Sequence, residues 1–106
     1  MYYAVEAKLI SGRARELHRL LADGTIARQK PDGREIVESM ARARIDPRGV
    51  VRWSEVCYCD TPLAHERETV LNRFFSDIQT EEVDDYVQFQ GEPLMEQLAQ
   101  LALRDE

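Results

Sequence analysis

The chain has 106 residues, of which 43% are hydrophobic and 32% charged, with only five glycines and four prolines. This length and composition exclude a disordered or low-complexity protein and predict one globular domain spanning residues 1–106. The net charge of -6 disfavours nucleic-acid binding, because a negative surface repels the phosphate backbone unless its cations gather on one face.

The sequence contains no membrane-spanning or leader-like segment. No stretch approaches about 18 consecutive apolar residues, and the first residues, MYYAVE, lack a basic region followed by an apolar one. The two cysteines are too few for a disulfide framework. We therefore expect a cytoplasmic protein without membrane contact.

Two elements are predicted at the N-terminus. Residues 2–10 alternate between apolar and polar positions as a half-buried strand does, with Tyr3, Val5, Ala7 and Leu9 facing inward and Tyr2, Ala4, Glu6 and Lys8 facing outward. A helix follows, capped by Ser11 and ended by Asp23-Gly24, with an apolar stripe of Ala14, Leu17, Leu20 and Leu21.

The next segment has two interpretations. Pro31 and Asp32-Gly33 interrupt residues 25–37, which favours a connection followed by a strand. The alternative is a helix over 34–44 through Ile36, Val37, Met40 and Ala41.

The strand interpretation rests on Asp46-Pro47-Arg48-Gly49, which has the residues of a type I turn followed by a left-handed glycine. The resulting hairpin pairs Ile45 with Val51, Ala43 with Trp53 and Ala41 with Glu55. One face then holds Ala41, Ala43, Ile45, Val51, Trp53, Cys57 and Cys59, with Glu55 as the exception. The other holds Met40, Arg42, Arg44, Arg52, Ser54, Val56 and Tyr58.

Three further elements complete the chain. Thr61-Pro62 is typical of a helix start, and apolar residues at helical spacing predict a helix over 62–76. Residues 83–90 alternate as a strand, with Val83, Val87 and Phe89 inward. A helix over 91–104 has an apolar stripe of Leu94, Met95, Leu98, Leu101 and Ala102.

The predicted order is β-α-β-β-α-β plus a C-terminal helix, the split βαβ arrangement of an α+β domain. It predicts a four-stranded antiparallel sheet with helices on one face. In this element order the chain resembles the ferredoxin-like fold, in particular the small dimeric α+β barrel proteins. The resemblance implies a homodimer that pairs the uncovered faces of two sheets, and either ligand binding or small-molecule chemistry.

The pair Cys57 and Cys59 raises the question of a disulfide or metal site. On a strand their Cα atoms lie about 6.5 to 7 Å apart, at or beyond the reach of an unstrained disulfide. A zinc site needs a further pair of ligands, which the sequence does not offer at the usual spacing. We therefore predict two small core residues, no metal site and no cofactor.

Two surfaces are candidates for function. The outward sheet face gathers Glu6, Arg42, Arg44, Arg52 and Tyr58, which we predict to bind a small anionic ligand or a protein partner, because Arg and Tyr are enriched in interface anchors. The alternative is a small-molecule enzyme of the dimeric α+β barrel type, with His65 or His18 as the acid/base. The residues alone do not decide whether the protein is an enzyme.

Overall fold

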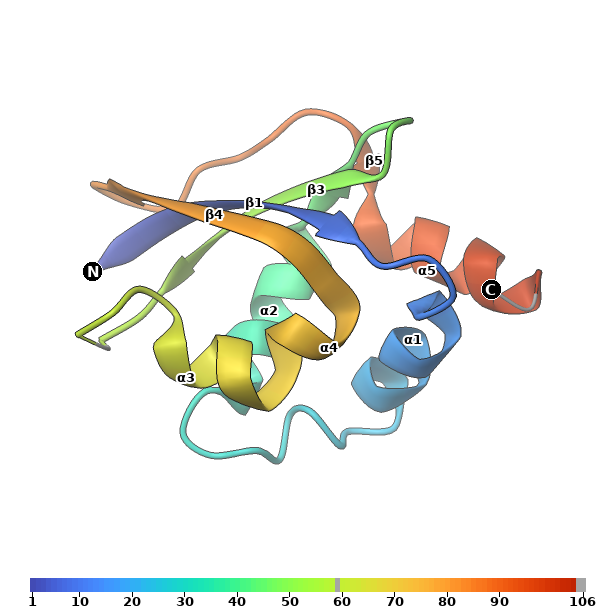
Figure 1. The fold of residues 1–106 in the computed structure, drawn as a ribbon, viewed down its shortest axis with the longest axis horizontal. Helices are drawn as coiled ribbons and strands as arrows, with labels where there is room; N and C mark the ends of the chain where they lie inside the picture. The colour runs from blue at the N-terminus through green and yellow to red at the C-terminus, as the bar shows by residue number, and fades with distance from the viewer. Residues whose placement is uncertain (59, 105–106) are drawn as a thin grey trace.

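The computed structural model describes residues 1–58 and 60–104. It has an α+β fold in which an antiparallel sheet, of strand order β4-β1-β3-β2-β5, lies on a layer of helices (Figure 1). The strands are β1 (Tyr2–Leu9), β2 (Arg44–Ile45), β3 (Val50–Val56), β4 (Phe75–Val83) and β5 (Glu92–Pro93). The helices are α1 (Ala14–Ala22), α2 (Gly33–Arg42), α5 (Leu94–Leu103) and one irregular helix formed by α3 (Ala64–Glu66), the π-helical η1 (Arg67–Leu71) and α4 (Asn72–Phe74).

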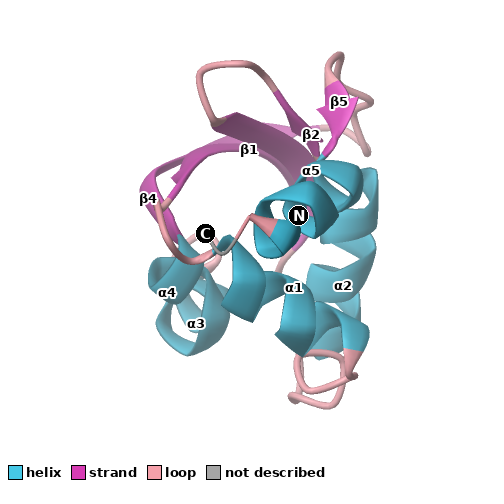
Figure 2. Ribbon diagram, turned by 90° about the vertical axis from the view of Figure 1, so that its right-hand side faces the viewer, coloured by secondary structure: helices cyan, strands magenta, loops and turns pink. Residues whose placement is uncertain are grey.

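The helices cover one face of the sheet, as predicted (Figure 2). The core between the two layers is centred on Trp53, Phe74 and Phe75, all fully buried. The sheet has five strands instead of the predicted four, because Glu92–Pro93 pairs with β2 at the edge. None of the helices in the described ranges is long and apolar enough to cross a membrane.

The central strand β1 confirms the predicted alternation. Tyr3, Val5 and Ala7 are buried beneath the sheet, whereas Glu6 and Lys8 are exposed on its outer face. The strand pairs with β3 on one side and β4 on the other. Helix α1 buries the predicted stripe of Ala14, Leu17, Leu20 and Leu21 and ends before Gly24, whose φ of 83° is the left-handed conformation that follows many helices.

The preferred interpretation of residues 34–43 was wrong, and the alternative helix was right. In α2, Ile36 and Met40 lie one turn apart and are buried, whereas Ala41 is exposed, the reverse of the strand prediction. A helix gathers Ile36, Val37 and Met40 on its inner side, whereas a strand would place Val37 on the face opposite Ile36 and Met40. The helix begins at Gly33, where a Cβ atom would lie 2.2 Å from the carbonyl oxygen of Ile26.

The predicted turn after Ile45 is confirmed. The Asp46 carboxylate accepts the backbone N–H groups of Arg48 at 2.9 Å and Val50 at 3.1 Å, and Gly49 has a φ of 84°. Ile45 pairs with Val51 as expected. The predicted pairs of Ala43 with Trp53 and of Ala41 with Glu55 do not form, because the paired part of β2 is Arg44–Ile45.

The strand predicted over 83–90 was also wrong, since β4 covers Phe75–Val83 and the helix before it ends at Phe74 rather than 76. Residues 84–91 instead cross the outer face of the sheet on their way to β5 (Figure 1). Val87 fixes this crossing, because its N–H donates to Ser54 Oγ at 2.9 Å and its carbonyl accepts from the same hydroxyl at 3.1 Å. The outer face is therefore partly covered by its own chain.

The last helix also begins later than predicted. Helix α5 starts at Leu94, because Glu92 and Pro93 are extended and pair with β2. Leu94 and Leu98 are its buried residues, and it packs beside α1 in the helix layer. The predicted apolar stripe thus serves the core of the domain.

Candidate functional site

The predicted ligand residues do not form one site. Arg42 lies at the end of α2 rather than on a strand, which corrects its predicted position. Its guanidinium donates to the Ser54 carbonyl at 3.0 Å, lies 3.7 Å from the Glu35 carboxylate and stacks over the Tyr86 ring at 4.3 Å. Tyr58 follows β3 and is 87% exposed.

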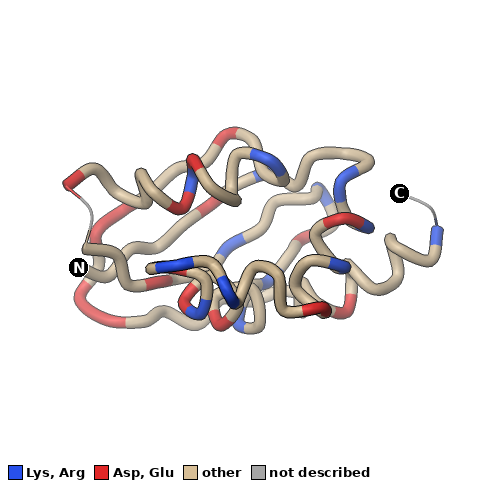
Figure 3. The backbone as a smooth tube through the Cα atoms, turned by 90° about the horizontal axis from the view of Figure 1, so that it is seen from below, with Lys and Arg blue, Asp and Glu red and all other residues tan. Residues whose placement is uncertain are grey.

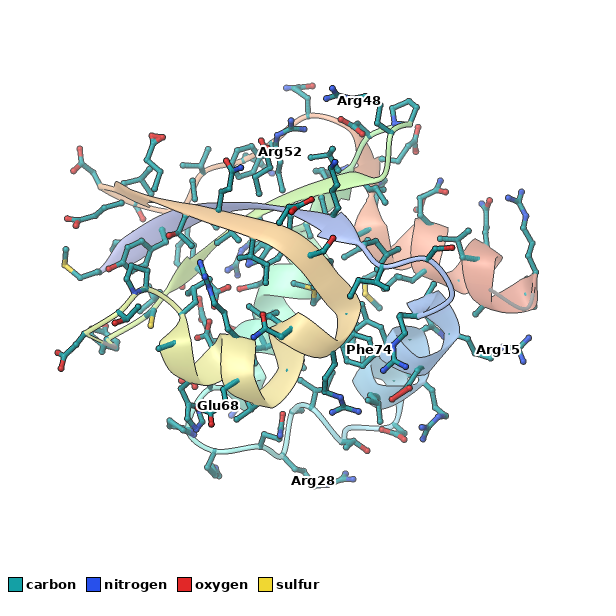
Figure 4. The ribbon with its side chains drawn as sticks, in the orientation of Figure 1. Arg15, Arg28, Arg48, Arg52, Glu68 and Phe74 are labelled. Atoms are coloured by element: carbon teal, nitrogen blue, oxygen red, sulfur yellow. The ribbon has the colours of Figure 1, made fainter. Side chains whose placement is uncertain are left out.

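The other two arginines of the set are engaged by groups of the chain itself. Arg52 projects from the outer face of the sheet (Figure 4), where it bonds to Glu6 at 3.1 Å and approaches Asp46 at 3.5 Å. Arg44 donates to the carbonyl of Gly91 at 3.2 Å. An anion would have to compete with these partners for both guanidinium groups.

A hollow of about 320 Å³ does lie on this outer face. Its charged lining residues are Glu6, Arg52 and Glu81, so carboxylates outnumber cations. On the opposite, helix-bearing side, basic and acidic residues are interspersed along the described chain (Figure 3). Neither the outer hollow nor the helix-bearing side gathers the cations into a patch suited to a phosphate backbone.

The strongest constellation involves His65. This residue is in the first turn of α3, and its Nδ1 lies 2.5 Å from Oδ2 of Asp32, the residue before α2. Sequence separates the two by 33 positions, and the packing of α3 beside the start of α2 brings them together. The other histidine, His18, is half-buried on α1, and no hydrogen bond or ion pair engages its ring within residues 1–58 and 60–104.

Asp32 also lines a second hollow, of about 450 Å³. Its wall combines the first turn of α2 with the end of β3 and comprises Pro31, Asp32, Glu35, Val56, Cys57 and Tyr58. The Glu35 carboxylate accepts the N–H of Val56 at 2.8 Å and the hydroxyl of Tyr86 at 3.1 Å. These bonds fix the carboxylate at the edge of the hollow.

Two acids are buried close to this hollow. Glu55 on β3 and Glu66 on α3 are each 1% exposed, and the indole of Trp53 donates to Glu55 Oε1 at 2.6 Å. As carboxylates, the second oxygen of Glu55 and both oxygens of Glu66 would have no donor. When Glu66 carries a proton and donates it to Glu55, two of these three oxygens gain a partner.

The electrostatics of the pair agree with this hydrogen bonding. Burial raises the pKa of Glu66 far above the ordinary glutamate value, and the neighbouring Glu55 raises it further. Burial also raises the pKa of Glu55, although its bonds to Glu66 and Trp53 oppose that rise. Glu66 therefore keeps its proton at neutral pH.

Sequence reasoning missed this pair. It gave Glu66 no role, and it noted Glu55 only as an exception to the inward pattern of β3. That exception was the available signal, because an acid at an inward position must find a partner or a proton.

The structure describes one of the two cysteines. Cys57 is buried under the helices as predicted, whereas Cys59 lies outside the described residues. Within the described part of the chain, no group of three or more His, Cys, Asp or Glu side chains is arranged to hold a metal ion.

Comparison with known proteins gives no homologue. The chain matches no protein-family model, no curated protein and no solved structure.

Proposed function

We propose that the protein is a small-molecule enzyme in which His65 transfers protons and Asp32 orients it. The observation that carries this proposal is the 2.5 Å contact between His65 Nδ1 and Asp32, which itself lines the 450 Å³ hollow. A hollow of this size is within the range of small-molecule sites. The strand order β4-β1-β3-β2 supports a relation to the split βαβ folds, among which the dimeric α+β barrels host such chemistry.

The dyad has a clear chemical use. A carboxylate that accepts the Nδ1 proton fixes both the orientation and the tautomer of an imidazole. The lone pair of Nε2 is then free to accept a proton from a bound molecule and to return it later. The reaction class is therefore proton transfer on a small organic substrate held against Asp32, Val56 and Tyr58.

The two histidines allow a matched test. Wild type, His65→Gln and His18→Gln would each be incubated with a small-metabolite extract, and time-dependent changes followed by mass spectrometry. We expect a metabolite that wild type and His18→Gln consume and that His65→Gln does not. If wild type changes nothing, or if His65→Gln retains the same activity, the proposal is wrong.

A second function, homodimer formation through the outer sheet face, has its own observation. Residues 84–91 cover this face with Tyr86, which is 43% exposed, and Val87, which is 38% exposed. The Tyr86 ring packs edge-on against Tyr2 at 5.1 Å, so an aromatic surface is held in place. Exposed aromatic and apolar side chains are typical of interface cores.

This dimer is tested by light scattering after size exclusion at micromolar concentration. We expect a dimer for wild type and a monomer for Val87→Asp, which would bury a charge in the interface. A strict wild-type monomer would exclude this second function. We favour a protein partner over an anionic ligand here, because Glu6 and Asp46 already occupy Arg52.

A further inference from the structure

The hollow beside His65 and Asp32 has a one-sided charge. Among the described residues, its charged lining residues are Asp32 and Glu35, both acids, and the others are Pro31, Val56, Cys57 and Tyr58. Apolar walls with a few fixed polar groups are the usual make-up of a small-molecule site. The fixed groups here can only accept hydrogen bonds or attract positive charge.

The nearest cation does not cancel this character. Arg42 lies 3.7 Å from Glu35, but its guanidinium bonds to the Ser54 carbonyl and stacks over Tyr86. It is not part of the wall of the hollow. Among the described residues, the charged groups in the wall of the hollow are therefore the two carboxylates, while Arg42 and His65 lie behind them.

A second observation, independent of the lining, points in the same direction. Glu66 is almost completely buried, and its carboxyl group shares a hydrogen bond with the buried carboxyl group of Glu55. Its carboxyl group interacts electrostatically with Asp32 and Cys57, two residues of the hollow's wall, and so lies close behind that wall. Any charge that this pair of acids carries is negative, and a low-dielectric wall focuses such a field into the hollow.

We infer that the hollow binds a small organic cation, an amine whose ammonium group lies between Asp32 and Glu35 and whose apolar body rests on Val56 and Tyr58. An ammonium supplies a positively charged donor to these two acids, and an aromatic ring such as that of Tyr58 attracts a cation at its face. This inference rests on the proposed function for the use of the hollow as a substrate site, and it names the class of that substrate.

Three probes of similar shape and different charge test the inference on the full chain. Benzylamine, benzyl alcohol and benzoate would be titrated into ¹⁵N-labelled protein and followed by NMR. We expect benzylamine to shift the amide signals of Glu35, Val56 and Tyr58, with binding at least roughly tenfold tighter than that of benzyl alcohol. Equal or tighter binding of benzoate, or no binding of benzylamine at millimolar concentration, would overturn it.

Matched variants locate the site. Glu35→Gln keeps an acceptor for the Val56 N–H and should weaken benzylamine binding roughly tenfold, whereas the exposed Glu38→Gln on the same helix should not. Tyr58→Ala, at an exposed position that cannot unfold the core, should also weaken it. If neither Glu35→Gln nor Tyr58→Ala weakens benzylamine binding, the hollow is not the cation site.

The outcomes separate this inference from the proposed function. Benzylamine binding without any His65-dependent turnover would leave the cation site standing and remove the enzyme. His65-dependent consumption of an acidic or uncharged metabolite, without benzylamine binding, would leave the enzyme and remove the cation site.

Discussion

Replacing Glu66 by glutamine should change how the stability of the protein depends on pH. The unfolded chain loses the Glu66 proton near the ordinary glutamate pKa of 4.5, whereas burial raises the pKa of Glu66 in the folded chain to about 11. Between these values the folded state binds one more proton than the unfolded state. The free energy of unfolding therefore falls as pH rises, by about 1.4 kcal/mol per pH unit.

The size of the effect follows from this slope. From about pH 5 to about pH 8 the Glu66 contribution to wild-type stability falls by up to about 4 kcal/mol. In Glu66→Gln the amide N–H can donate to Glu55 at every pH, and position 66 no longer binds or releases a proton. The free energy of unfolding of the variant should fall much less over the same pH range, and the variant should be the more stable protein at the higher pH.

Urea unfolding at several pH values, followed by the fluorescence of the single tryptophan, measures this difference. Trp53 is a direct reporter because its indole bonds to Glu55. Glu68→Gln is the control, since Glu68 is exposed on the same irregular helix and points away from the core (Figure 4). A pH slope in Glu66→Gln equal to that of wild type would refute the retention of the Glu66 proton.

Two further changes test the fold. Gly33→Ala should lower the free energy of unfolding, measured in urea, by about 2 kcal/mol or more. The new Cβ would lie 2.2 Å from the Ile26 carbonyl oxygen, so the start of α2 would have to shift. An unchanged urea midpoint would contradict this packing. Asp46→Asn should flatten the loss of stability in acid. Partial desolvation raises the Asp46 pKa, but hydrogen bonds from Arg48 and Val50 outweigh it and lower the pKa to about 2. The Asp46 carboxylate therefore stabilises the wild-type fold above about pH 4, and this stabilisation is lost as pH falls towards 2. Acid unfolding curves that superimpose for the two proteins would count against the turn bonds.

The parts of the fold that could be predicted are those fixed by local signals. The alternation of β1 and the Asp46 turn each depend on neighbouring residues, and both are confirmed. The segment containing Ile36 and Met40 fits a helix and a strand about equally by pattern alone. The segment forms a helix because its apolar side packs against the core, and that packing depends on the whole fold.

The same limit explains the misplaced strand. Residues 83–90 alternate because the segment lies across the sheet face with Val87 held by Ser54, a contact between residues 33 positions apart. The true β4 alternates poorly, since it is an edge strand with a bulge and Asp77 has a φ of 51°. Pattern alone cannot distinguish a strand from a segment laid over a sheet.

The candidate site shows a similar division. His65 was identified from its residue type and its place on a helix. Asp32 was read only as part of a turn, because no local pattern connects it to a histidine 33 positions away. The buried acids remained hidden because the helix over 62–76 was predicted with a regular period, whereas the π-helical turn that follows Glu66 changes the facing of the helix.

The most direct test of the His65 and Asp32 dyad is the tautomer of the His65 ring, measured by long-range ¹H–¹⁵N NMR at a pH where the imidazole is neutral. We expect the proton on Nδ1, donated to Asp32, with Nε2 unprotonated, and we expect Asp32→Asn to change this distribution. A ring that carries its proton mainly on Nε2, with the same distribution in wild type and Asp32→Asn, would contradict the dyad and the function built on it.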